Sequence, residues 1–460
     1  MRSPLGTRTR VALAAAAATT LALLAPGNAG AAGGVPNTPT DLYNGLLACS
    51  TDASAPVYVA GRGGLELEGI ASHTDPTANH LSEEFRYWPT ADPAQLGTAV
   101  RDWAYPGSEA SVEVTGLTDG ATYGWQARTV GPDGAASDWS AACYVAVDDT
   151  TPAAAPTVSS PNYPQGQTNQ PGAPIQIDLG ANGVGDVAGY QITWYSTFSV
   201  PGASIGEHGI PHFLDPFDGT HGVRAQTVGG TARMTLVPPA GLSGWLTLDV
   251  RSMDRAYNAS QPTRYTILLK PDAPTVTRLS HATQFGKPTP FRLSPEPGLQ
   301  AASPVVSYTV THYGTTVTTT TVPANPNGTA ETTVTLDGPS GDKLVVNTTS
   351  ANGWTSQQTW WDNGYLDSTP TITSPQYPDG GENTGPGTFH FAPKIKGAQI
   401  ASYTYSFDWG NNPITIPAAA HGEADVIWTP PTSGWYLLIV HATTKDGVAL
   451  DDTYYSFTVD

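Results

Sequence analysis

The residues best suited to chemistry lie in a segment rich in histidine and carboxylate near the middle of the chain. Between residues 207 and 221 the sequence holds three of its ten histidines and three carboxylates. Imidazole and carboxylate groups together suit zinc or another divalent cation. Gly209 and Pro211 exclude a regular helix, and no HExxH phrase is present, so a polar surface loop is the alternative that we favour. The candidate metal ligands are His208, His212, Asp215, Asp218 and His221.

Aromatic residues form the second group of candidates. Four of them fall within twelve residues of one another, namely Trp354, Trp360, Trp361 and Tyr365. Neighbouring strand residues face opposite sides, so only one of Trp360 and Trp361 can face solvent if both lie in a strand. An exposed indole can stack on a sugar ring, which makes these residues candidates for ligand binding. The alternative, which we favour, is that the rings fill space between two sheets or against the following segment. Trp245 and Trp435 each follow a glycine, and we expect structural roles for both.

Motifs for catalysis are the next test. We expect no serine nucleophile elbow, no phosphate-binding loop and no arrangement of a nucleophilic cysteine. Paired carboxylates for acid-base chemistry cannot be recognised without their separation in space. We therefore expect no catalytic residue, no cofactor and no enzymatic activity.

The two cysteines and the N-terminal segment indicate an extracellular protein. Residues 1–32 carry three arginines, an apolar stretch and then small residues, the pattern of a secretory signal peptide. In the oxidising compartment that this implies, Cys49 and Cys143 should form a disulfide. No later segment approaches the length of apolar sequence that a membrane helix needs, so we expect no membrane span.

An internal repeat predicts the architecture. Pro161-Asn-Tyr-Pro164 returns as Pro375-Gln-Tyr-Pro378, 214 residues later, and further matches follow in the same order. Such repeats indicate tandem structural units. The chain lacks a sustained apolar period of 3.6 and instead shows short alternating runs separated by Gly and Pro turns. The fold class that we predict is all-β, a tandem array of immunoglobulin-like β-sandwiches.

Residues 38–150 resemble a known module. The phrase from Val112 to Arg128, followed by Trp139-Ser140, resembles the fibronectin type III module, in which a leucine leads a turn and a tyrosine follows six residues later. Those positions are Leu117 and Tyr123. The resemblance implies a tyrosine corner, in which the hydroxyl of Tyr123 bonds to the backbone upstream.

A second phrase, from Asp254 to Ser260, resembles a turn of immunoglobulin-like repeats in secreted actinobacterial proteins, with Tyr257 in place of the usual glycine. The domains that we predict are a fibronectin type III-like sandwich at 38–150 and immunoglobulin-like sandwiches at 155–270, 271–367 and 368–460. The second sandwich carries an inserted loop at 196–231.

Charge and fold together limit the function. With 20 basic and 39 acidic residues the formal net charge is -19, which makes nucleic acid an unsuitable partner. We expect a secreted, non-catalytic binding, adhesive or spacer protein whose partner is an extracellular protein or polysaccharide of unknown identity. The alternatives are a carbohydrate-binding protein that uses the third-domain aromatics and a metal-dependent enzyme that uses the histidine-rich insertion. The sandwich fold alone cannot choose among them.

Overall fold

The computed structural model describes residues 34–460 except 200–201, 207–210, 243, 282–283 and 396. The predicted signal peptide lies outside the described residues. The described chain is almost entirely β, as predicted, and it forms two compact units. Of the described residues, the first unit contains 34–57, 61–147, 205–206 and 211–212, and the second contains the others. The described residues form one helix, α1 (Pro297–Ala302), which is far too short to cross a membrane.

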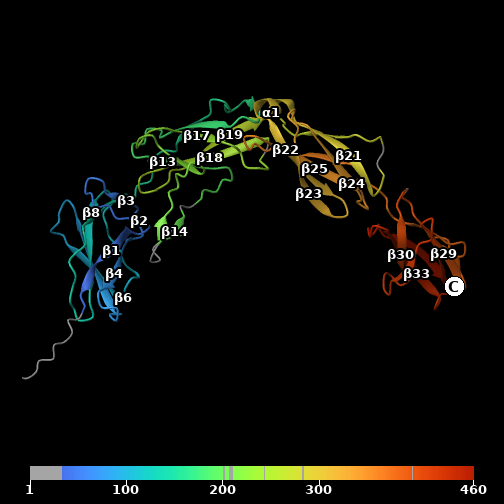
Figure 1. Ribbon diagram of the computed structural model, residues 1–460, viewed down its shortest axis with the longest axis horizontal. Coiled ribbons are helices and arrows are strands. Elements are labelled where there is room, and N and C mark those ends of the chain that lie inside the picture. The colour runs from blue at the N-terminus through green and yellow to red at the C-terminus, as the bar shows by residue number, and fades with distance from the viewer. Residues whose placement is uncertain (1–33, 200–201, 207–210, 243, 282–283, 396) are drawn as a thin grey trace, which may run out of the picture. The chain divides into compact units, whose positions relative to one another are not determined.

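The N-terminal sandwich consists of two sheets (Figure 1). One has the order β2-β1-β4-β7 and contains β2 (Leu47–Ala48), β1 (Pro36–Asn44), β4 (Leu65–His73) and β7 (Glu109–Val114). The other has the order β3-β9-β8-β5-β6 and contains β3 (Val57–Val59), β9 (Cys143–Val147), β8 (Thr122–Val130), β5 (Leu81–Pro89) and β6 (Gly97–Ala104). Alternate residues of each strand face the core, where Phe85 and Trp125 pack with ring centroids 6.1 Å apart.

Two predictions about this sandwich are confirmed. Cys49 and Cys143 form a disulfide with their Cα atoms 5.3 Å apart. The hydroxyl of Tyr123 accepts a hydrogen bond from the backbone N–H of Thr118 (3.0 Å), which makes the tyrosine corner that the resemblance implied. The disulfide joins segments that are 94 residues apart in the sequence, whereas the tyrosine corner closes a local turn before β8.

The second and the last sandwich have the same topology, which explains the sequence repeat. In the second, the sheets are β10-β12-β17 and β11-β19-β18-β13-β16, made of β10 (Thr157–Ser159), β12 (Ile175–Gly180), β17 (Ala232–Leu236), β11 (Thr168–Asn169), β19 (Thr263–Leu269), β18 (Trp245–Met253), β13 (Gly189–Thr193) and β16 (Gly222–Arg224). In the last, they are β27-β29-β32 and β28-β34-β33-β30-β31, made of β27 (Thr371–Thr373), β29 (Gly387–Ala392), β32 (Ala424–Trp428), β28 (Glu382–Asn383), β34 (Thr453–Val459), β33 (Gly434–Thr444), β30 (Ile400–Ser406) and β31 (Ile414–Pro417). In both, the short strand at the edge of the larger sheet runs parallel to its neighbour: β11 pairs with β19, and β28 pairs with β34.

The repeated Pro-x-Tyr-Pro phrase places a buried, hydrogen-bonded tyrosine at the same position in each of the two sandwiches. Tyr163 and Tyr377 are buried, and each hydroxyl donates to a backbone carbonyl further along the chain (2.7 and 2.5 Å). The carbonyls of the same two residues accept from the hydroxyls of Tyr265 and Tyr455 (2.9 and 2.6 Å). A buried tyrosine needs a partner for its hydroxyl, and this arrangement satisfies two of them in each repeat.

The third sandwich shares a core with the second. Its sheets are β20-β21-β24 and β23-β22-β25-β26, made of β20 (Thr275–Arg278), β21 (Lys287–Ser294), β24 (Ala330–Leu336), β23 (Val317–Pro323), β22 (Val305–Tyr313), β25 (Lys343–Ser350) and β26 (Thr359–Asp362). One continuous cluster of buried side chains draws on both sandwiches. At the junction Trp354 stacks on Tyr163 with centroids 6.3 Å apart, and its Nε1 donates to Asp272 Oδ2 (3.0 Å). The two sandwiches are therefore joined by buried contacts as well as by the linker.

The turn that carries Tyr257 keeps its shape without a glycine. Tyr257 adopts φ of +62°, the left-handed region that glycine usually occupies. The buried carboxylate of Asp254 accepts hydrogen bonds from the backbone N–H groups of Ala256 and Asn258 (2.8 and 2.9 Å), and these bonds hold the turn. The geometry that the substitution put in doubt is thus retained, with the strain borne by one tyrosine.

Candidate functional site

The most distinctive surface feature is a pair of exposed tryptophans on the last sandwich. Trp409 and Trp435 lie with ring centroids 4.7 Å apart and an interplanar angle of 58°. Their residues are 58% and 50% exposed. Large apolar side chains that gather on a surface mark interaction sites more often than isolated ones do.

A tight turn after β30 presents Trp409. Trp409, Gly410 and Asn412 all have positive φ (54°, 87° and 48°). Buried Ser406 braces the turn, because its hydroxyl donates to the carbonyl of Asn411 and accepts from the N–H of Asp408 (3.1 Å). A non-glycine residue in the left-handed region costs roughly 1–2 kcal/mol. Such strain clusters at functional positions, and here it holds an exposed indole in one place.

Strand alternation presents Trp435. In β33 the buried residues Leu438, Val440 and Ala442 are separated by two positions, so Trp435 belongs to the opposite, outward-facing set. Asp408 also forms a bridge with Leu437, which brings the turn alongside this strand. The two indoles therefore meet on the outer face because two independent backbone elements place them there.

Trp245 and Trp435, for which a structural role was expected, both lie on the surface. Trp245 is 75% exposed, since Leu246 and Leu248 of β18 occupy the core and leave Trp245 on the outer face. The glycine before each tryptophan marks the start of a strand, where the outward-facing position has no covering layer. Matching positions in a repeat show a shared backbone, and they do not show that the side chain is buried.

The aromatic candidates of the third sandwich divide into two buried or partly buried rings and two exposed ones. Trp354 is buried at the junction described above, so it cannot serve as a surface for a ligand. Trp361 faces inward against Phe291 (centroids 4.7 Å), while Trp360 and Tyr365 are exposed. The Nζ of Lys343 lies 3.5 Å from the centroid of the Trp360 ring and occupies one face of it. Only the other face of Trp360 is available for stacking.

Every sandwich exposes at least one tryptophan. In the first unit Trp103, again at positive φ (64°), lies edge-on to His80 with centroids 4.4 Å apart. With Trp245, Trp360 and the Trp409–Trp435 pair, exposed indoles occur on all four sandwiches. Of these five tryptophans only Trp360 was among the residues predicted from the sequence to bind a ligand. For Trp245 and Trp435, their positions opposite the buried leucines of alternating strands were a usable signal of exposure.

Three of the five candidates in the histidine-rich insertion pair with residues of the same insertion. Asp215 accepts from Arg224 Nη2 (2.6 Å), and Asp218 pairs with His221 Nδ1 (3.2 Å). His212 lies in β15 (Pro211–Phe213), the partner of β14 (Ala203–Ile205), and His208 lies outside the described residues. Within the described part of the chain, none of the three-residue clusters with metal-ligand spacing includes a member of this set.

The expectation that no serine nucleophile elbow occurs overlooked one phrase. Gly202-Ala-Ser-Ile-Gly206 has the GxSxG spacing. A nucleophile elbow is a sharp turn between a strand and a helix, whereas Ser204 lies within β14 of a two-stranded sheet. The spacing alone therefore does not make this serine a nucleophile.

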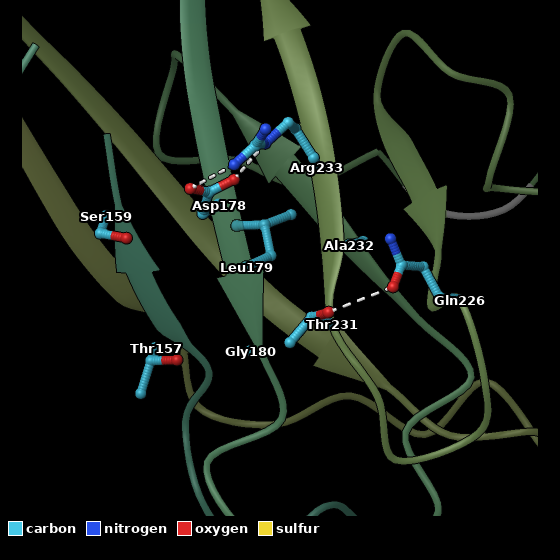
Figure 2. A pocket seen from close by; sticks show the side chains of 9 residues that line it. All are labelled: Thr157, Ser159, Asp178, Leu179, Gly180, Gln226, Thr231, Ala232 and Arg233. Carbon is cyan, nitrogen blue, oxygen red and sulfur yellow. Dashed lines mark hydrogen bonds and ion pairs between the residues drawn. The ribbon is translucent and has the colours of Figure 1, made fainter. Parts of the chain in front are cut away.

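A polar groove lies on the second sandwich (Figure 2). It encloses about 580 Å³ over β10, β12 and β17. Arg233 crosses to Asp178 with two hydrogen bonds (2.5 and 3.0 Å), so the two charges neutralise each other, and threonine and serine hydroxyls line the rest. The lining residues include no aromatic side chain. This groove can offer hydrogen bonds to a polar ligand but no stacking surface.

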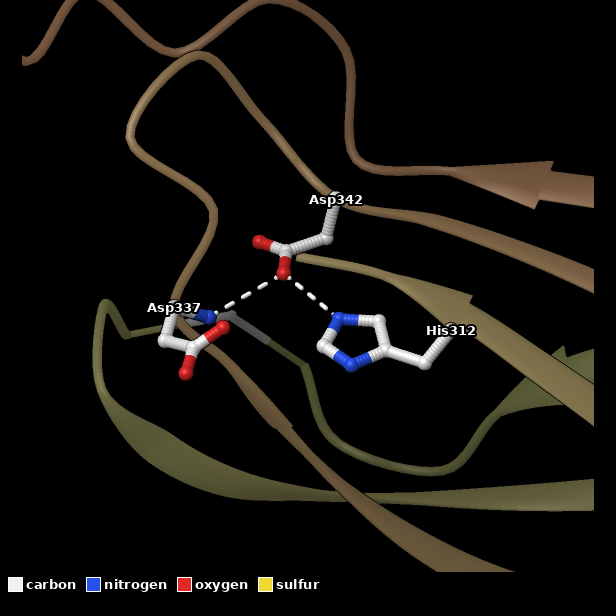
Figure 3. Close-up of side chains that lie close together, drawn as sticks. All are labelled: His312, Asp337 and Asp342. Atoms are coloured by element: carbon white, nitrogen blue, oxygen red, sulfur yellow. Dashed lines mark hydrogen bonds and ion pairs between the residues drawn. The ribbon is translucent and has the colours of Figure 1, made fainter. Parts of the chain in front are cut away.

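The third sandwich contains a buried histidine–aspartate pair (Figure 3). Asp342 Oδ1 lies 2.7 Å from His312 Nε2 and also accepts from the N–H groups of Asp337 and Gly338 (both 3.0 Å). Its Oδ2 accepts from Asn363 Nδ2 (3.2 Å). With these bonds both oxygens of Asp342 are engaged, so the pair acts to fix the loop between β24 and β25.

The comparisons with known proteins concern the fold alone. The sequence matches no protein-family model and no curated protein. Among solved structures it is similar to the fibronectin(III)-like modules of Clostridium thermocellum CbhA (14% identity, 40% of this chain and 94% of that chain, TM-score 0.17). It is also similar to a mutant of Salmonella alpha-2-macroglobulin (12% identity, 93% of this chain and 33% of that chain, TM-score 0.21). Both TM-scores are below 0.5, so neither similarity bears on function. The fold itself defines the class, a tandem array of immunoglobulin-like β-sandwiches.

Proposed function

We propose that this chain is a secreted, non-catalytic protein that binds polysaccharide through tryptophans exposed on its sandwiches. The observation that carries the proposal is the Trp409–Trp435 pair, two adjacent indoles on the surface. A strained, hydrogen-bonded turn holds Trp409, and strand β33 holds Trp435. The disulfide supports an extracellular location, because such bonds persist in oxidising compartments.

Indole stacking suits a sugar chain for a physical reason. The C–H faces of a pyranose ring are apolar, and a rigid tryptophan buries area against them with little loss of side-chain entropy. Covering about 100 Å² of indole yields about 2.5 kcal/mol, so a pair yields about 5 kcal/mol before the cost of association is subtracted. A single site of this kind binds weakly.

Several weak sites on one chain can nevertheless hold a polymer. When the ligand is itself repetitive, a second contact is intramolecular and raises the overall affinity without any new type of contact. The exposed tryptophans of the other sandwiches supply such contacts. An insoluble polysaccharide is therefore the ligand that this distribution fits best, in preference to a small sugar.

The test is a sedimentation assay with insoluble polysaccharides. The full secreted chain is mixed with cellulose, chitin and cell-wall material, and the fraction bound is measured with Trp409→Ala/Trp435→Ala as the variant. Loss of about 5 kcal/mol of contact corresponds to a decrease in affinity of more than 1000-fold at a single site, reduced in practice by the remaining sites.

The matched control is Ile427→Ala, which removes another highly exposed apolar side chain of the same sandwich. Retention of this control together with release of the double variant supports the proposal. Equal retention of both variants, or none by the unaltered chain on every material, contradicts it.

A spacer role is the second candidate, favoured by the shared core of the second and third sandwiches. Buried junctions make two domains move as one body, which suits a protein that holds other parts at a distance. Small-angle scattering of the full chain tests this role. Trp354→Ala should increase the spread of end-to-end distances if the junction is what makes the pair rigid.

A further inference from the structure

Three glutamates converge on the outer face of the N-terminal sandwich. One carboxylate oxygen from each of Glu66, Glu68 and Glu109 lies within 4.8 Å of the others. Glu66 and Glu68 belong to β4, and Glu109 is the first residue of β7. None of the three belongs to the tryptophan surfaces or to the histidine-rich insertion.

Strand register explains the convergence. Residues two apart in a strand share a face, so Glu66 and Glu68 point the same way. In the antiparallel ladder, Glu68 pairs with Ser111 and Ile70 pairs with Glu109, which places Glu109 diagonally across from Glu68. Diagonal neighbours are within reach of long side chains. Three acidic side chains are thus delivered to one point by two neighbouring strands.

The central glutamate is buried and incompletely bonded. Glu68 is 3% exposed, and its Oε2 has no hydrogen-bond partner. Its neighbours Glu66 and Glu109 carry the same charge, and each brings a carboxylate oxygen to the same point. Buried carboxylates of like charge are costly unless a proton or a cation neutralises them.

We infer that Glu66, Glu68 and Glu109 form a binding site for a divalent cation of the hard, oxygen-preferring class, with Ca²⁺ as its ion. All three ligands are carboxylates, and Ca²⁺ accepts both one and two oxygens from each, with bonds of about 2.3–2.6 Å. The set contains no imidazole or thiolate, the donors that zinc prefers. Three glutamates supply three to six oxygens, and water completes the shell of the exposed side.

Calcium would bind the two strands together from outside. An ion that binds only the folded form raises the free energy of unfolding, and above its Kd this increase grows with the logarithm of the ion concentration. The cation also removes the mutual repulsion of the three carboxylates. The site therefore couples the stability of the N-terminal sandwich to extracellular calcium.

The experiment is a calorimetric titration of the full chain with CaCl₂ after removal of metals by chelation. The titration is made at about pH 8, because carboxylates bind metal only when deprotonated. We expect binding in the range of extracellular calcium modules, with Kd of about 10⁻⁴–10⁻³ M. Glu68→Gln and, separately, Glu109→Gln should each weaken binding by at least about tenfold, since even residues outside the ligand shell commonly contribute that much.

The control is Glu84→Gln. Glu84 lies in β5, which belongs to the other sheet of the same sandwich, and its carboxylate bonds to Arg128 (2.7 Å). Its substitution should leave calcium binding unchanged. Glu68→Gln is isosteric and removes a repulsive charge, so it should fold at least as well as the parent chain, which circular dichroism checks.

Three results would overturn the inference. They are an unaltered chain that binds no calcium, a Glu68→Gln variant that binds it as the parent does, and equal losses from Glu68→Gln and Glu84→Gln. A second acidic group, Asp148, Asp186 and Asp254, lies elsewhere in the chain. Loss of binding through Asp254→Asn with retention in Glu68→Gln would move the site there and refute the assignment to Glu68.

Discussion

A buried glutamate in the first sandwich makes a prediction about pH that can be worked out in full. Glu83 belongs to the inward-facing set of β5 with Leu81 and Phe85. It is completely buried, and neither carboxyl oxygen has a hydrogen-bond partner. A Cβ at Gly69 would lie 2.3 Å from Glu83 Oε1, so the carboxyl occupies the space that this glycine leaves. The perturbation that we choose is Glu83→Gln, which keeps the shape and removes the ionisation.

Burial sets the magnitude. It raises the pKa of Glu83 from 4.5 to about 8. A carboxyl whose pKa is raised by folding stabilises the fold fully below the pKa of the unfolded chain, and that contribution is lost as pH rises to the folded value. Relative to Glu83→Gln, the parent chain should therefore lose about 1.4 kcal/mol per pH unit between pH 4.5 and 8. The total is about 5 kcal/mol, a large part of the stability of one domain.

Hydrogen exchange followed by mass spectrometry is the suitable assay, because a chain of several domains does not unfold in one step. Peptides from β5 and β8 report the opening of this sandwich alone. Parent and variant are compared at the same pH, so that the intrinsic exchange rate cancels. The ratio of their protection factors should change by about tenfold per pH unit, or about 1000-fold between pH 5 and pH 8.

The control is Glu84→Gln, one residue further along. Its carboxylate faces outward and bonds to Arg128 (2.7 Å), so the same ratio should stay constant. A constant ratio for Glu83→Gln as well would refute the reasoning. It would mean that Glu83 ionises equally in the folded and unfolded chain, and therefore that water or another group reaches it.

Three further predictions test the contacts that hold the sandwiches. Cys143→Ser frees Cys49 and should lower the free energy of unfolding of the first sandwich by about 4–5 kcal/mol, measured by denaturant unfolding with and without reductant. Trp354→Phe leaves the buried carboxylate of Asp272 short of one donor and should cost about 1–3 kcal/mol, seen in calorimetry as separation of two melting transitions. Tyr308→Phe removes a 2.6 Å hydrogen bond to a backbone carbonyl and should lower the stability of the third sandwich by about 1 kcal/mol, measured by the same method.

The fold was largely predictable because its signals are local. Alternation, turn residues and a repeated phrase are properties of short segments, and they were sufficient to predict a tandem array of sandwiches. The disulfide followed from having only two cysteines in an oxidising compartment. The tyrosine corner of Tyr123 followed from the resemblance to the fibronectin type III module. The shared core of the second and third sandwiches was not predictable, because it depends on which loops of different domains meet.

The candidate site was predicted poorly because exposure is not a local property. Strand alternation predicts that Trp360 and Trp361 face opposite sides of the sheet, but it does not tell whether another sheet or domain covers the outer side. It also separates Trp435 from the buried set of its strand without saying whether another layer covers the outer face. The matching positions of Trp245 and Trp435 in the repeat were taken to indicate a structural role, but a shared backbone position carries no information about the exposure of the side chain.

The acidic cluster illustrates the same limit in another form. That Glu66 and Glu68 share a face follows from their spacing alone. That Glu109 joins them depends on the register between β4 and β7, and a shift of one residue would turn it to the other face. Chemistry on a sandwich therefore arises between strands, where pairing brings side chains together. On this protein the places that merit the first experiments are those where neighbouring backbone elements deliver matching groups. They are the three carboxylates from two strands of one sheet, and the two indoles from a turn and a strand of the last sandwich.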